Sequence, residues 1–208
     1  MGRQEFIFYM ANRLTRNGWL LALAGALEAV YAVLMVAALD QEGLLTLRTG
    51  ISRTTILSLG KLVIAAGICT VAAGMWRTTK GRGWWLALNG FGLCSLGAIE
   101  WIVAHWSLRM SFRPFTALFV LIAVTLGVFA FRESAKMAGA ISMIFALVFL
   151  VLTMGAINLR QHAPEFLNIC MSAYFAFSAI FLLTFTWRAQ GPRHAIDSLL
   201  GSGSPHPA

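Results

Sequence analysis

Six apolar stretches, each about twenty residues long, make up most of this chain. They run over residues 17–39, 54–76, 83–106, 113–131, 135–157 and 167–187, and short loops that carry most of the charges separate them. A helix rises about 1.5 Å per residue, so it needs close to twenty residues to cross a hydrocarbon layer. The pattern predicts an all-α integral membrane protein with six transmembrane helices.

The composition favours lipid as the surroundings of this chain. Hydrophobic residues account for 59% and charged residues for 12% of the sequence, whereas a soluble domain has about 25% charged residues. The net charge of +8 does not indicate a nucleic-acid partner, because the basic residues lie in the loops. The expected partner is the lipid bilayer.

The chain divides into three parts by composition. Residues 1–16 are predicted to form a cytoplasmic or interfacial segment, because the apolar and aromatic run Phe6–Met10 is followed by Arg13 and Arg16. The six-helix transmembrane domain is expected at residues 17–190. A disordered cytoplasmic tail is expected at residues 191–208, since its Gly, Ser and Pro residues have little apolar surface to bury.

Lys and Arg residues indicate how the helices are oriented. Ten of the 16 lie in the N-terminal segment, the second and fourth loops and the tail; five lie in the other loops. The remaining one, Lys61, lies inside an apolar stretch. Cytoplasmic loops carry the excess of basic residues, so both termini are predicted to face the cytoplasm, and the chain is expected in the cell (inner) membrane as a multi-pass protein.

Internal repetition is the strongest organising signal. Residues 17–25 align with residues 82–90, and the same register brings Gly25, Gly90 and Gly139 together. The even-numbered stretches end on an aromatic residue followed by arginine, at positions 76–77, 131–132 and 187–188. We therefore predict three parallel two-helix repeats over about residues 17–77, 82–132 and 135–188.

The repeated pattern resembles a known family. A Gly-Trp-Trp start at Gly83 after a basic loop, glycine-spaced odd helices and aromatic-arginine ends are similar to the HdeD-like acid-resistance membrane proteins. The resemblance spans about Asn17 to Arg188, although residues 40–43 lack the proline expected there. It implies a six-helix inner-membrane protein of bacteria, associated in some members with survival in acid, and implies no particular molecular activity.

Glycines recur at seven-residue spacing within two stretches, at Gly60, Gly67 and Gly74 and again at Gly90 and Gly97. Small residues on one stripe let helix backbones approach closely in lipid. Close helix packing is the favoured interpretation of these glycines, together with Gly25 and Gly139. The alternative is that they line a pore or act as hinges.

Three ionisable residues inside the apolar stretches are the main candidate site, because a charge in hydrocarbon costs at least about 2.5–3.5 kcal/mol. Lys61 and Glu100 lie at similar depths from the same side, so we predict an ion pair between them; the alternative is that both extend to the lipid headgroups. Glu28 lies deeper, near the middle of the first stretch. A neutral structural glutamate is favoured for it over a functional proton site.

The other polar residues indicate less. Asn89 is expected to hydrogen-bond a neighbouring helix. His105 and His162 fall near the outer surface, where they are candidate pH sensors or simply solvated side chains. The three cysteines are isolated in separate stretches, and no metal, cofactor or catalytic motif is predicted.

Two classes of function follow. The leading one is a membrane protein of stress response that acts without catalysis, through association with itself or with another membrane protein. The alternative is a small transporter or channel whose polar path passes Glu28, Lys61 and Glu100. A transporter requires these three side chains to line one path, whereas a packing protein leaves them separate.

Overall fold

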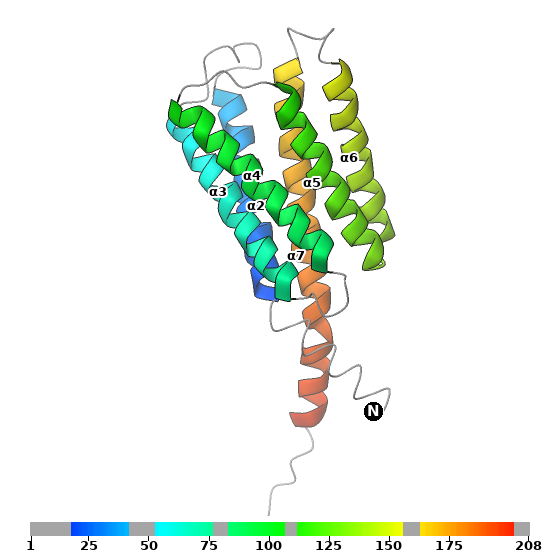
Figure 1. Cartoon of the computed structure of the whole chain (residues 1–208). Coiled ribbons are helices and arrows are strands. Elements are labelled where there is room, and N and C mark those ends of the chain that lie inside the picture. Colours follow the sequence, from blue (N-terminus) through cyan, green and yellow to red (C-terminus); the bar gives the residue numbers. More distant parts are fainter. Residues whose placement is uncertain (1–17, 42–52, 77–82, 107–111, 156–162, 202–208) are drawn as a thin grey trace, which may run out of the picture.

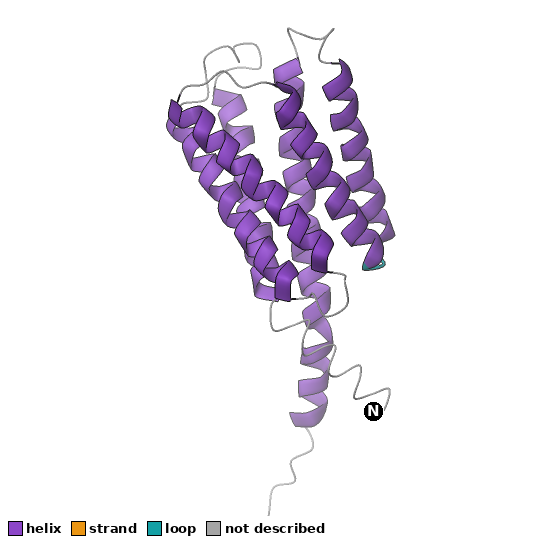
Figure 2. Ribbon diagram, in the orientation of Figure 1, coloured by secondary structure: helices purple, strands orange, loops and turns teal. Residues whose placement is uncertain are grey.

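The chain folds into six long helices in a computed structural model that describes residues 18–41, 53–76, 83–106, 112–155 and 163–201 (Figure 1). Their bounds are α2 Gly18–Gln41, α3 Arg53–Trp76, α4 Gly83–Trp106, α5 Phe112–Arg132, α6 Lys136–Gly155 and α7 Ala163–Gly201. All six are long and apolar enough to cross a membrane, and the described ranges contain no strand (Figure 2). The predicted all-α fold with six helices of membrane-spanning length and apolar character is confirmed.

The helices form a closed ring in which each one contacts its two neighbours along the chain and α2 contacts α7. They alternate in direction, so that the start of α2 and the C-terminal half of α7 lie at the same end of the bundle (Figure 1). The most extensive contacts join α3 to α4, α2 to α7 and α5 to α6. Side chains fill the middle of this ring.

Helix α7 is much longer than the other helices and extends beyond the bundle (Figure 1). We expected disorder from residue 191 onward, but the helix continues to Gly201. Residues 195–200 include Ala and Leu, which are strong helix formers, and the expectation gave too much weight to the polar residues around them. Residues 202–208 and the N-terminal segment 1–16 lie outside the described residues.

The outer surface of the bundle is strongly apolar. Helix α6 shows this most clearly, since Met137 is 80%, Leu147 60% and Met154 72% exposed. A water-soluble protein rarely exposes so large a contiguous apolar surface. Lipid tails surround such side chains without cost, which agrees with helices that cross a bilayer.

Aromatic side chains fill much of the interior. The ring centroid of Phe119 lies 4.8 Å from that of Phe149 and 5.9 Å from that of Phe175, so α5, α6 and α7 meet there. Phe175 in turn lies 4.3 Å from the ring of Tyr31 on α2. Edge-to-face and tilted pairs of this kind are favourable packing geometries for aromatic rings.

The turn between α5 and α6 closes with a left-handed residue. Ser134 has a φ of 65°, and the amide of Ala135 donates to the carbonyl of Ala130 over 2.9 Å. This six-to-one bond satisfies a carbonyl that the end of a helix otherwise leaves unpaired. The turn therefore holds α5 and α6 as a tight antiparallel pair.

Backbone contacts between α3 and α4 position the rest of the bundle. A Cβ atom built on Gly67 would lie 2.7 Å from the carbonyl oxygen of Gly90, and one on Gly90 would lie 2.7 Å from the carbonyl oxygen of Gly67. Gly60 and Gly97 face each other in the same reciprocal way, at 2.9 and 2.5 Å. Because real Cβ atoms do not approach backbone atoms so closely, only glycine permits this separation of the two helices.

We predict that Gly67→Ala destabilises the bundle by about 1–3 kcal/mol, because the added methyl group meets backbone atoms that cannot move aside. Gly127→Ala is the matched control, since its methyl group would meet the flexible side chain of Met143 at 3.1 Å and would lie no closer than 3.3 Å to the nearest backbone atom, the carbonyl oxygen of Gly139. Thermal unfolding in detergent should give a lower Tm for the first variant and a Tm near wild type for the second. Equal Tm values for the two variants would contradict the packing interpretation.

Candidate functional site: buried polar groups of the bundle

Glu28 lies in the middle of the bundle, ten residues or about 15 Å along α2 from its first residue. Its side chain is 1% exposed. Ser178 of α7 lies beside the carboxyl group, but neither carboxyl oxygen has a hydrogen bond of normal geometry to the described part of the chain. Burial without partners makes the ionised form of a carboxyl group costly.

The hydroxyl group of Tyr174 forms the other part of this centre. Tyr174 lies on α7, one helical turn before Ser178, and is within electrostatic range of Glu28. Asn89 of α4 and Ser142 of α6 lie beside its hydroxyl group. The hydroxyl oxygen is buried and has no aligned hydrogen bond to any described residue.

The neighbouring polar side chains direct their hydrogens at backbone carbonyls. The amide nitrogen of Asn89 donates to the carbonyl of Ile122 over 2.8 Å, which links α4 to α5. The hydroxyl of Ser142 donates to the carbonyl of Ala123 over 2.8 Å, which links α6 to α5. These two bonds hold helices together, and they use one amide hydrogen of Asn89 and the only hydroxyl hydrogen of Ser142.

Glu100 occupies a second buried position, seventeen residues or about 25 Å along α4 from Gly83. Its Oε1 atom accepts a hydrogen bond of 2.9 Å from the hydroxyl of Tyr31 on α2. The second oxygen, Oε2, is buried without a hydrogen-bond partner among the described residues. The bond to Tyr31 crosses the ring of helices and fixes the orientation of the Glu100 carboxyl group.

The predicted ion pair between Lys61 and Glu100 is wrong. Lys61 is exposed, whereas Glu100 points into the bundle and is bound by Tyr31. Gly60 faces α4, and the next residue along a helix is turned by about 100°, which directs Lys61 away from the interior. Lys61 therefore does not join Glu28 and Glu100 in one polar path.

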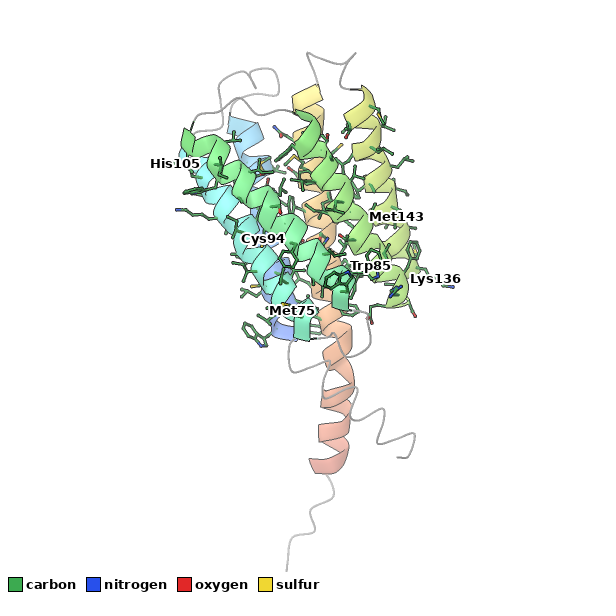
Figure 3. All side chains as sticks on the ribbon, viewed as in Figure 1. Met75, Trp85, Cys94, His105, Lys136 and Met143 are labelled. Atoms are coloured by element: carbon green, nitrogen blue, oxygen red, sulfur yellow. The ribbon has the colours of Figure 1, made fainter. Side chains whose placement is uncertain are left out.

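His105 lies at the end of α4 that is opposite Trp85 (Figure 3). It is exposed and its ring stacks on Trp101, with 5.1 Å between centroids. The structure does not bring it to the buried carboxyl groups. His162 falls outside the described residues.

The cysteines lie on three different helices and are partly buried: Cys69, Cys94 and Cys170. No group of three or more His, Cys, Asp or Glu side chains that could hold a metal ion occurs in the described part of the chain.

Sequence reasoning missed Tyr31 and Tyr174. Tyr31 lies three residues after Glu28 and therefore on the same face of α2, which was a usable signal. Tyr174 stands in a run of aromatic residues, where nothing in the local sequence separates it from an ordinary packing side chain.

The chain was compared with known protein families, curated proteins and solved structures. No protein-family model matches this chain, and no curated protein or solved structure matches it.

Proposed function

We propose that this chain is a bacterial inner-membrane protein of acid-stress response that acts without catalysis, and that the carboxyl group of Glu28 is the part that responds to acid. The observation that supports this proposal is the burial of both Glu28 oxygens without a hydrogen-bond partner in the described residues. In that environment the ionised form of the carboxyl group has a much higher free energy than the protonated form. Loss or gain of a proton there therefore changes the stability of the surrounding structure. Its effect passes to other molecules through association with a second copy or with another membrane protein.

The first test replaces Glu28 with glutamine, which keeps the shape of the side chain and removes its charge. We expect Glu28→Gln to lower survival of producing cells after acid shock, with the amount of protein in the membrane unchanged. Glu133→Gln is the matched control, because Glu133 is a partly exposed carboxyl group in the α5–α6 turn. Normal survival of the Glu28 variant at a normal protein level contradicts the proposal.

The proposed topology has three parallel two-helix repeats with both termini in the cytoplasm. The contacts favour this arrangement, since the extensive helix pairs α3/α4, α5/α6 and α7/α2 each join one proposed unit to the next. Gly25, Gly90 and Gly139 each lie at one of these between-unit contacts. Arg132, which stands 5.7 Å from the ring centroid of Trp85, marks the proposed cytoplasmic end of the bundle.

Reporter tags test the orientation. We expect a fluorescent protein that folds only in the cytoplasm to fluoresce when fused at either terminus. A phosphatase that is active only in the periplasm should show no activity at either terminus. A phosphatase fused after residue 109, in the predicted outer loop, is the positive control. Opposite signals at the two termini contradict the topology.

A small transporter or channel is the second candidate function. It is favoured by buried polar groups at three depths, since Asn89, Glu28 and Glu100 lie about 9, 15 and 25 Å along parallel helices α4 and α2. The path in this version excludes Lys61, which is exposed.

Proton or solute flux in liposomes tests the second candidate. If the path conducts, a pH step across the membrane drives flux in the wild type, and Glu28→Gln reduces that flux at least about ten-fold, because the middle group of the path is lost. Empty liposomes are the control. A flat trace in the wild type removes the transport function and leaves the acid-response proposal standing.

A further inference from the structure

We propose that Glu28 and Tyr174 form a binding site for one small monovalent cation, either a proton or an alkali-metal ion, at the mid-depth of the bundle. This inference deepens the proposed function and rests on the role given there to Glu28.

The charge balance around Glu28 favours a cation. The basic side chains that the structure describes are all exposed: Lys61, His105, Arg132 and Lys136. No protein cation therefore neutralises an ionised Glu28 within that part of the chain. A bound proton or alkali-metal ion makes the site neutral, as a low-dielectric interior requires.

The other ionisable groups that share the interior or the helices packed on α2 do not supply that charge. They are hydroxyl, thiol and carboxyl groups: Tyr31, Cys69, Cys94, Glu100, Cys170 and Tyr174. Each is neutral or negative, so none competes with a cation for Glu28. Glu100 adds to the negative potential when it is ionised.

The hydrogen-bond inventory points to the same ligand. Asn89 and Ser142, which flank the hydroxyl of Tyr174, already donate to carbonyls of α5. The buried atoms left without a partner in this centre are oxygens, namely both carboxyl oxygens of Glu28 and the hydroxyl of Tyr174. The carboxylate oxygens of Glu28 offer only lone pairs, which bind protons and alkali-metal ions, and the Tyr174 hydroxyl offers lone pairs together with one hydrogen.

The backbone holds these oxygens together. Tyr174 and Ser178 lie one turn apart on α7 and thus on one face, and α7 packs closely on α2 at Gly25, where a Cβ atom would lie 3.2 Å from the carbonyl oxygen of Ala179. Gly25 precedes Glu28 by three residues. The close approach of the two helices therefore brings the Glu28 carboxyl group to the polar face of α7.

Glu100 provides an internal comparison. Its Oε1 atom is already bound by Tyr31, so each buried carboxyl group has its own tyrosine. Tyr174→Phe should affect the Glu28 site alone, and Tyr31→Phe should affect the Glu100 carboxyl alone. This pairing gives matched control variants of identical chemistry.

The experiment is infrared difference spectroscopy on the full chain in lipid nanodiscs. One arm steps the pH and follows the carbonyl band of protonated carboxyl groups; the other replaces choline chloride by sodium chloride at constant pH and ionic strength. We expect one band to vanish in Glu28→Gln and a different one in Glu100→Gln. Tyr174→Phe should weaken cation binding at Glu28 about ten-fold, with Tyr31→Phe leaving it unchanged.

The two arms separate the sources of the charge. If the intensity of the Glu28 carbonyl band changes with pH and is unaffected by sodium, the site binds a proton. If sodium removes the band at constant pH, the site binds an alkali-metal ion. Identical spectra of wild type and Glu28→Gln in both arms overturn the inference, as does an equal effect of the two tyrosine variants. Size-exclusion profiles and Tm values confirm that each variant is folded. Normal acid survival of Glu28→Gln together with a Glu28 band refutes the proposed function and leaves the binding site.

Discussion

Lipid offers no hydrogen bonds, and this constraint determines most of the structure. Every backbone amide and carbonyl group in the membrane must find its partner within the protein, so each crossing segment is a helix. Polar side chains follow the same rule: Thr70, Ser95 and Thr186 each donate to the carbonyl four residues earlier on their own helix. Against this background of satisfied groups, the unpartnered oxygens of Glu28, Glu100 and Tyr174 stand out.

The helices of the bundle pack against one another in two different ways. Helices α3 and α4 touch backbone to backbone through facing glycines and leave little room for side chains between them. Phe119, Phe149 and Phe175 fill the space between α5, α6 and α7 with rings. Glu28 projects from α2 toward α7, outside the glycine contact. The glycine contact between α3 and α4 thus provides a rigid frame, and the polar centre lies outside it, next to the approach of α2 to α7 at Gly25.

The sequence predicted the helices well because apolar length is a local property. The predicted stretch 83–106 coincides with α4, and 54–76 differs from α3 by one residue. Seven-residue spacing also placed the glycines of α3 on one face. The Lys61–Glu100 pair failed because equal depth does not fix the rotation of a side chain about its helix axis, which only packing determines. Tyr174 was not predicted because it stands among other aromatic residues in the sequence. Only the polar side chains of other helices, which the sequence does not place, distinguish it from a packing residue.

The two buried carboxyl groups differ in a way that matters for function. Glu100 has a fixed partner, since the hydroxyl of Tyr31 donates a hydrogen bond of 2.9 Å to its Oε1 atom. One of its two carboxyl oxygens is therefore already hydrogen-bonded. Glu28 has Ser178 beside it but no aligned hydrogen bond, and Asn89 and Ser142, which flank the nearby Tyr174 hydroxyl, donate to α5 instead. In the register that aligns Gly25, Gly90 and Gly139, the position of Glu28 corresponds to Leu93 and Ser142 in the other two units of the proposed repeat. In the proposed repeat, the carboxyl group therefore comes from the first unit, and the polar side chains of Tyr174 and Ser178 beside it come from the third.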